Sequence, residues 1–215
     1  MIGHTPPFVF IHVPKTAGTS LTEALGPYGK SVSGPENRDD PYFRHASARQ
    51  IRDALGPRFE GYYRFGFIRN PWDWCLSNYY FNRGMHLPYR SGTRWDTQDI
   101  TPKKGYNVPR DIMEMAFPDW LDWWLETLRP SMLGLMCDET GTILVDDVFC
   151  VERIDRDFGT IKRRLGLPED LVLHRRNVTS QREAGLLSEQ FGAREARRVG
   201  DYFHREAVIG DYRCR

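Results

Sequence analysis

The stretch Phe8-Val-Phe-Ile-His-Val-Pro-Lys-Thr-Ala-Gly-Thr-Ser-Leu21 decides the fold of this chain. Residues 8–13 are apolar apart from His12, which is typical of a strand buried on both faces of a sheet. A polar turn that contains Gly18 follows, and a helix is predicted to begin at residue 19 or 20. A buried strand, a tight turn and a helix start therefore follow one another directly.

A second stretch, Phe65-Gly-Phe-Ile-Arg-Asn-Pro-Trp-Asp-Trp-Cys-Leu-Ser77, repeats this order. Residues 62–68 are rich in aromatic and apolar side chains and predict a strand. A helix is expected over residues 71–82, because Asn70 is a favoured N-cap residue and Pro71 suits the first helical position.

The rest of the chain continues the alternation of strands and helices. The predicted segments are a helix with a capping box at Ser47 and Gln50, an aromatic-rich helix over 118–128, a strand over 142–151, a helix over 155–165 that Asp155 caps, and a final helix over 188–206. This alternation predicts a three-layer, P-loop-like α/β fold with a central parallel sheet flanked by helices. The length of 215 residues suits a single domain over residues 1–215.

The composition excludes several classes of protein. Hydrophobic residues make up 40% and charged residues 27%, as in an ordinary globular protein. The net charge of +1 gives no overall field that would attract nucleic acid or a membrane surface. No apolar run resembles a signal peptide or a transmembrane segment, so a cytoplasmic protein is expected. The 4 cysteines show no metal-ligand spacing and are expected to be reduced, and no metal is expected.

The first polar turn has the features of an anion site. The residues between strand and helix are Lys15, Thr16, Ala17, Gly18, Thr19 and Ser20. Backbone N–H groups at such a turn point to a common centre, and the helix dipole favours negative charge there. The turn lacks the GxxxxGK[ST] pattern of nucleotide-triphosphate loops. The alternative interpretation is a surface lysine in a polar turn.

The second turn carries a further candidate. Arg69 ends the predicted strand, and Ser77 lies about two turns into the next helix, so both could grip one phosphate. In the alternative interpretation, Arg69 pairs with Asp73 and Ser77 only packs. Two anion sites on one parallel sheet indicate a ligand with two separate anionic ends.

Together these two motifs resemble those of the sulfotransferases that use 3′-phosphoadenosine 5′-phosphosulfate (PAPS), especially the carbohydrate-type branch and its bacterial, family 2-like relatives. The resemblance implies that the motif over 12–21 binds the 5′-phosphosulfate and the motif over 67–77 the 3′-phosphate. Weaker similarities extend over 141–146, 152–158 and 210–212. Relatives carry Arg where this chain has Cys150, so no role is assigned to the end of that strand.

The resemblance further implies that the segment over 174–182 closes over the 3′-phosphate end of PAPS. Thr179 and Arg182 are the expected contacts in this segment. A solvated basic loop is the alternative interpretation. Residues 84–110 predict a long loop, often a lid or substrate loop, in which Trp95 is expected to face a ligand.

Sulfuryl transfer in this family implies an in-line attack by an acceptor hydroxyl, with 3′,5′-adenosine diphosphate as the product. Lys15 is expected to neutralise the leaving phosphate. His45 is the expected general base, because it precedes a capped helix in a segment that supplies a catalytic histidine in relatives. A solvent-exposed histidine is the alternative, with Glu36 and Asp40 as other candidate bases. His12 suits the role less, since it lies in a buried strand.

The acceptor implied by the resemblance is a sugar hydroxyl on a glycan or glycoconjugate. The cluster Arg194, Arg197 and Arg198 is either a local basic patch or a solvated helix face. Two other functions remain open: a small-molecule kinase with a degenerate phosphate loop, and a non-catalytic nucleotide-binding protein.

Overall fold

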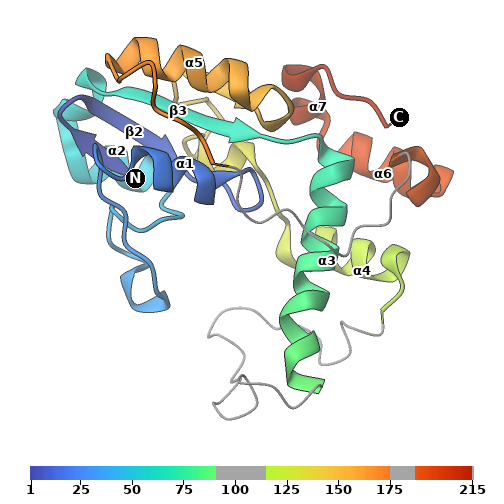
Figure 1. The fold of residues 1–215 in the computed structure, drawn as a ribbon. Coiled ribbons are helices and arrows are strands. Elements are labelled where there is room, and N and C mark those ends of the chain that lie inside the picture. The colour runs from blue at the N-terminus through green and yellow to red at the C-terminus, as the bar shows by residue number, and fades with distance from the viewer. Residues whose placement is uncertain (91–114, 175–186, 215) are drawn as a thin grey trace. The chain divides into compact units, whose positions relative to one another are not determined.

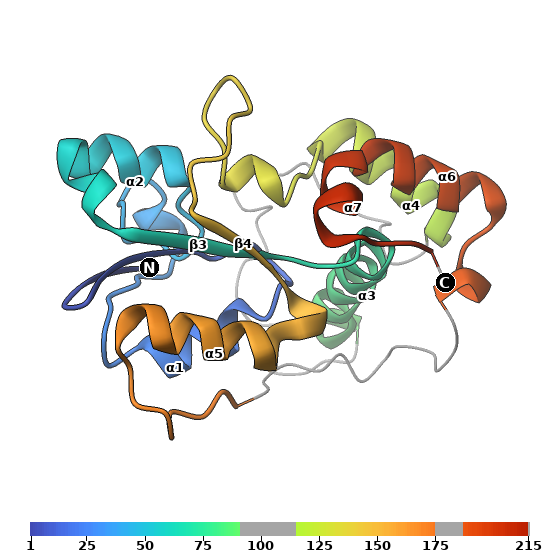
Figure 2. The same cartoon turned by 90° about the horizontal axis from the view of Figure 1, so that it is seen from above.

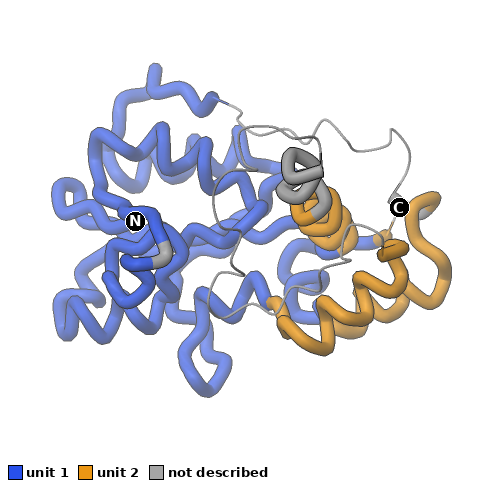
Figure 3. Tube along the Cα trace, turned by 90° about the horizontal axis from the view of Figure 1, so that it is seen from below, with its two compact units in different colours: residues 1–71, 131–178, 203–213 blue, residues 72–130, 179–202, 214–215 orange. Residues whose placement is uncertain are grey.

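The structure is a computed structural model that describes residues 1–90, 115–174 and 187–214 (Figure 1). Contacts divide the chain into two compact units (Figure 3). Unit 1 comprises residues 1–71, 131–178 and 203–213, and unit 2 comprises residues 72–130, 179–202 and 214–215. The assignment of the whole chain to one domain stays a prediction.

A sheet of four strands forms the centre of unit 1. The strands β1 (Ile2–His4), β2 (Pro7–Ile11), β3 (Tyr63–Ile68) and β4 (Asp147–Cys150) lie in this order. The pairs β2–β3 and β3–β4 are parallel, whereas β1 pairs antiparallel with β2. The predicted α/β class with a mostly parallel sheet is confirmed. The short antiparallel strand β1 was not predicted.

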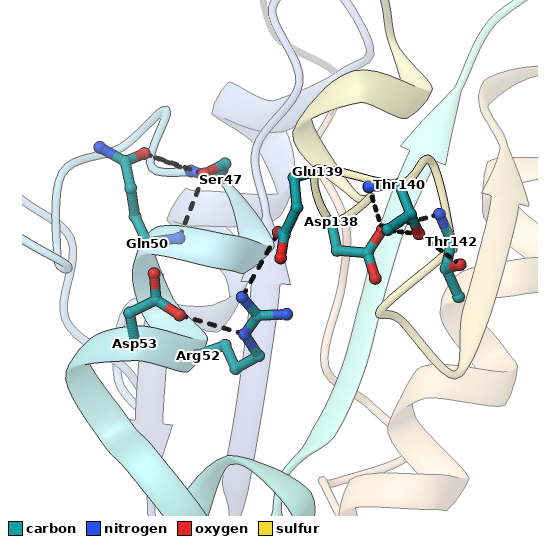
Figure 4. Close-up of polar contacts among 8 residues, drawn as sticks. All are labelled: Ser47, Gln50, Arg52, Asp53, Asp138, Glu139, Thr140 and Thr142. Atoms are coloured by element: carbon teal, nitrogen blue, oxygen red, sulfur yellow. Dashed lines mark hydrogen bonds and ion pairs between the residues drawn. The ribbon is translucent and has the colours of Figure 1, made fainter.

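The chain before β4 turns instead of running extended. The Asp138 carboxylate accepts hydrogen bonds from the main-chain amides of Thr140 and Thr142, both at 2.9 Å (Figure 4). This Asx-type turn competes with extended backbone. The predicted strand over 142–151 is too long: residue 142 belongs to this turn, residues 145–146 form a bend, and β4 spans only Asp147–Cys150.

Helices cover both faces of this sheet, which gives unit 1 three layers. The helices α1 (Gly18–Leu25) and α5 (Ile154–Leu165) lie on one face, and α2 (Ala48–Leu55) lies on the other (Figure 2). The core between the sheet and the first pair of helices contains Phe8, Phe10, Phe65, Phe67, Leu21, Leu25, Phe158 and Ile161.

The structure corrects the predicted ends of two helices, and the helix predicted from residue 188 begins only at Ala193, after a 3₁₀ turn over Leu187–Gln190. Helix α5 has Arg153 at its N-cap, and Asp155 lies in the first turn, where its charge still complements the helix dipole. The predicted final helix over 188–206 is interrupted, so that α7 (His204–Gly210) begins after Phe203, which has φ −99° and ψ 33°.

Unit 2 is built from helices around an aromatic core. They are α3 (Pro71–Arg90), α4 (Phe117–Trp123), which a π-helical turn over Trp124–Leu128 extends, and α6 (Ala193–Tyr202). Their core contains Trp72, Trp74, Tyr79, Trp120, Trp124 and Phe191. Helix α3 continues to Arg90, so the loop predicted over 84–110 is wrong for residues 84–90, and the rest of that prediction lies outside the described residues. Trp95 lies outside the described residues.

Among the described residues, no helix has the length and the apolar character that crossing a membrane requires.

Candidate anion-binding site

The loop between β2 and α1 has a strained, preformed shape. Lys15 and Ala17 adopt left-handed backbone conformations, with φ of 64° and 58°. Such angles are uncommon for residues other than glycine and concentrate at ligand-binding sites. Left-handed residues in a turn let neighbouring backbone N–H groups converge on one point, as they do in anion-binding nests. The loop geometry thus supports an anion site over the alternative of a surface lysine in an ordinary turn.

Buried polar groups hold this loop in place. Thr16 is fully buried, and its hydroxyl donates a hydrogen bond to the Val13 carbonyl oxygen at 2.9 Å. Thr16 therefore uses its hydroxyl proton within the loop itself. Ser20 is also buried, whereas Thr19 is exposed in the first turn of α1.

Gly18 is required because the His12 imidazole occupies the space of a side chain. A Cβ atom at residue 18 would lie 2.0 Å from the Cδ2 and Nε2 atoms of His12. Burial, and then the charge of nearby His45, lowers the pKa of His12 to about 2. His12 thus remains neutral and packs beside the loop, although it directly follows β2 (Pro7–Ile11) and does not lie within the strand as predicted.

The side chain of His45 packs against His12. The rings of His12 and His45 meet edge to face with centroids 4.7 Å apart. The His45 Nδ1 atom lies 2.8 Å from the His12 carbonyl oxygen. Because a carbonyl oxygen only accepts hydrogen bonds, Nδ1 must carry the proton and Nε2 must hold a free lone pair. Burial lowers the pKa of His45, so the imidazole is neutral at pH 7.

Helix α2 fixes the chain that carries His45. The Ser47 hydroxyl accepts a hydrogen bond from the main-chain N–H of Gln50, and the side-chain oxygen of Gln50 accepts one from the main-chain N–H of Ser47 (Figure 4). This confirms the predicted capping box. His45 is half-buried rather than solvent-exposed, so the alternative interpretation of this residue is wrong. The other candidate bases make hydrogen bonds within their own loop. Glu36 accepts a hydrogen bond from the Asn37 side chain, and Asp40 accepts one from the main-chain N–H of Tyr42.

Arg69 joins the first anion loop. Its Nη1 atom donates a hydrogen bond to the Lys15 carbonyl oxygen at 3.2 Å. Its own amide donates to the Met132 sulfur at 3.4 Å. Burial, together with the charge of Arg69, lowers the pKa of Lys15. A bound anion would relieve this repulsion between two neighbouring cations.

Some of the other predicted contact residues lie among the described residues, and others do not. Ser77 is buried on α3, in unit 2, and Asp73 belongs to the same unit. Arg69 belongs to unit 1, so its pairing with Ser77 would join the two units and stays a prediction. Thr179 and Arg182 lie outside the described residues. Arg194 and Arg198 form ion pairs with Asp122, at 2.7 and 3.2 Å, which favours the solvated helix face over a free basic patch.

An open cavity of about 390 Å³ adjoins the anion loop through Ser20. Its walls include Ser20, Glu23 and Ala24 of α1, and Leu171, Val172 and His174 of the chain after α5. Leu171 and Val172 could not be predicted as wall residues, because residues 171–174 form no regular element with a readable period.

The site combines a strained anion loop, two cations and a neutral imidazole with a free nitrogen. Among the described residues, no group of three or more His, Cys, Asp or Glu side chains could hold a metal ion. The arrangement can bind an anion, neutralise charge that develops on it, and accept a proton from a nearby hydroxyl.

The substitution Gly18→Ala should strain this site. The added Cβ atom would overlap the His12 ring, and forced overpacking of this kind costs about 1–3 kcal/mol. Differential scanning calorimetry should show a Tm several degrees below that of the unmodified protein. Gly61→Ala is the matched control, because a Cβ atom there meets nothing within 4 Å. Equal Tm values for the two variants would contradict the proposed role of the glycine.

Comparison with known proteins identifies the family of this chain. The sequence matches a family model described as the sulfotransferase family over residues 1–203. No curated protein and no solved structure gives a significant match. Because the matched residues include most of the chain, with the stretches 12–21 and 67–77 among them, this protein belongs to the sulfotransferase family.

Proposed function

We propose that this sulfotransferase moves the sulfuryl group of PAPS to a hydroxyl group on a carbohydrate or glycoconjugate, with 3′,5′-adenosine diphosphate as the second product. The observation that carries the proposal is the hydrogen bond of 3.2 Å from the Arg69 guanidinium to the Lys15 carbonyl oxygen. This contact supports a single site in which the loop that carries Lys15 and the side chain of Arg69 face the same ligand. PAPS suits such a site, because it has a phosphosulfate at one end and a phosphate at the other.

The described residues fit this donor in their chemistry. The left-handed residues Lys15 and Ala17 orient loop N–H groups for a phosphate, and the Lys15 ammonium adds a full charge. Arg69 offers a guanidinium, which suits the paired oxygens of a second phosphate. Ser77, Thr179 and Arg182 complete the proposed set. The cavity beside Ser20 is our candidate for the space that receives the nucleotide base.

PAPS, when bound, supplies a sulfuryl group on a phosphate that can leave. The protein contributes position and charge, as in phosphoryl transfer. Lys15 neutralises the charge that grows on the leaving phosphate, and the loop N–H groups hold its other oxygens. The acceptor oxygen forms a bond to sulfur while the bond from sulfur to the bridging oxygen breaks.

His45 receives the proton of the acceptor hydroxyl at Nε2. The hydrogen bond from Nδ1 to the His12 carbonyl, at 2.8 Å, selects this tautomer and orients the ring. The imidazole is already neutral at pH 7, because burial lowers its pKa. A base that is unprotonated before the acceptor binds can act without first losing a proton.

The glycan nature of the acceptor rests on the resemblance to the carbohydrate-type branch. The expected cytoplasmic location likewise stays a prediction.

The substitution Lys15→Ala should abolish most of the transfer activity. The measurement is release of 3′,5′-adenosine diphosphate from PAPS in the presence of a panel of glycans, alcohols and phenols. A loss of about 10²-fold or more is expected, because one electrostatic contact to the transition state is removed. Lys30→Ala, at an exposed lysine, should leave the rate unchanged. Turnover that survives in Lys15→Ala would exclude this role, and an inactive unmodified protein would favour a non-catalytic nucleotide-binding protein.

The substitution His45→Ala should lower the transfer rate by about 10²–10⁴-fold while the affinity for 3′,5′-adenosine diphosphate stays within twofold. In the unmodified protein the rate should fall only below pH 6.5, since the base must be neutral and its pKa lies below the ordinary value of 6.5. This acid limb should disappear in His45→Ala. His4→Ala, at an exposed histidine that contacts Tyr62 and Tyr42, is the control. An unchanged rate in His45→Ala would remove this residue from the mechanism.

A further inference from the structure

The turn that presents Arg69 is tied to the chain after β4. The Asn70 amide donates a hydrogen bond to the Glu152 Oε1 atom at 2.7 Å. Glu152 lies in a 3₁₀ turn over Val151–Arg153, directly after β4. A carboxylate that accepts from a backbone N–H makes a charge-assisted hydrogen bond, which is stronger than a neutral one. The ends of β3 and β4 are thereby joined at the edge of the sheet that carries the anion loop.

Tyr212 holds the second oxygen of the same carboxylate. Its hydroxyl lies 2.5 Å from the Glu152 Oε2 atom. Burial, and the neighbouring groups of Cys150 and Glu152, raise the pKa of Tyr212. The phenol therefore stays protonated and donates the hydrogen bond. Glu152 is thus held between the Asn70 amide and the Tyr212 hydroxyl.

The end of α7 explains how Tyr212 reaches this position. Asp211 is left-handed, with φ 52°, and the Tyr212 amide donates to the Ala207 carbonyl at 2.9 Å. This is the hydrogen-bond pattern of a Schellman motif, which reverses the chain at a helix end. The Tyr212 ring then lies over Gly210, where a Cβ atom would be 2.0 Å from the ring. The sequence Gly210-Asp-Tyr212 thus determines where the Tyr212 hydroxyl lies.

A second contact joins the same two segments. The Asn70 side-chain amide donates a hydrogen bond to the Arg213 carbonyl oxygen at 3.2 Å. Asn70 is therefore held through its main chain by Glu152 and through its side chain by residue 213. Since the Asn70 nitrogen belongs to the peptide group that follows Arg69, these contacts fix one of the two peptide planes beside Arg69. The Met132 sulfur, at 3.4 Å from the Arg69 amide, holds the other.

We propose that Glu152 and Tyr212 are positioning residues for Arg69. They fix the backbone from which the guanidinium extends, so that it stays beside the Lys15 loop and meets the 3′-phosphate of the donor. A long, flexible arginine binds a phosphate more tightly when its backbone is held in advance. This inference rests on the proposed function, and it gives a role to the strand end that sequence analysis left without one.

The test compares two ligands that differ only in the 3′-phosphate. Isothermal titration calorimetry would measure the Kd of 3′,5′-adenosine diphosphate and of 5′-adenosine monophosphate for the unmodified protein and for Tyr212→Phe and Glu152→Gln. The unmodified protein should prefer the bisphosphate. Tyr212→Phe should reduce this preference by about three- to tenfold, the effect of one lost hydrogen bond, with the monophosphate Kd unchanged. Glu152→Gln keeps an acceptor for the Asn70 amide and should lose less than Glu152→Ala.

A double substitution separates positioning from general stability. Tyr212→Phe should have no further effect on the bisphosphate Kd in an Arg69→Ala background, since the two residues act through one contact. Tyr63→Phe is the matched control, because its hydroxyl donates to the Asp147 carboxylate at 2.6 Å at the opposite ends of β3 and β4. This variant should keep the full preference.

The possible outcomes distinguish the inference from the proposed function. Equal affinity of the unmodified protein for both ligands would overturn the proposed 3′-phosphate site, and the positioning role with it. A preference that Tyr212→Phe and Glu152→Gln both retain would overturn the positioning role alone. Additive losses in the double variant would also do so. If Tyr212→Phe fails to fold, as judged by circular dichroism, the pair Glu152→Gln and Glu152→Ala decides the question, and a full preference for the bisphosphate in both would overturn the positioning role.

Discussion

The site depends on one constraint, the parallel pairing of β2 with β3. Parallel neighbours end at the same edge of a sheet, so the turns that follow them must meet. The hydrogen bond from Arg69 to the Lys15 carbonyl joins residues 54 positions apart in the sequence. It also brings two positive charges together, and this repulsion contributes to the lowered pKa of Lys15. A ligand with two anionic groups offsets that cost, and this is the physical basis of the proposed donor.

His12 connects this anion site to the proposed base. Its ring contacts Gly18, and its carbonyl oxygen accepts a hydrogen bond from the Nδ1–H group of His45. A single buried residue after β2 therefore sets both the shape of the loop and the tautomer of the base. Arg69 is held in a similar way by its surroundings, through Met132 on one side and Glu152 on the other. The functional groups themselves are few, and most of the neighbouring contacts fix their backbones.

Much of this could be predicted from the sequence, because buried parallel strands and capped helices leave local patterns. The apolar runs of β2 and β3 and the capping box at Ser47 are such patterns. Strand β1 has only 3 residues and leaves no readable period. The break at Phe203 was missed because this buried residue continues the apolar stripe of the preceding helix. The contacts of Met132 and Tyr212 depend on tertiary folding, which brings distant residues together and which no local pattern reveals.

The measurement that tests the central claim most directly is calorimetric titration of the protein with 3′,5′-adenosine diphosphate, beside ATP with and without Mg²⁺. A site built from the Lys15 loop and Arg69 should bind the bisphosphate at micromolar concentrations without a metal. Arg69→Ala should weaken this binding by about 2 kcal/mol or more, since a charge-assisted contact is lost. A preference for Mg²⁺–ATP, unchanged in Arg69→Ala, would contradict the account and point to a kinase.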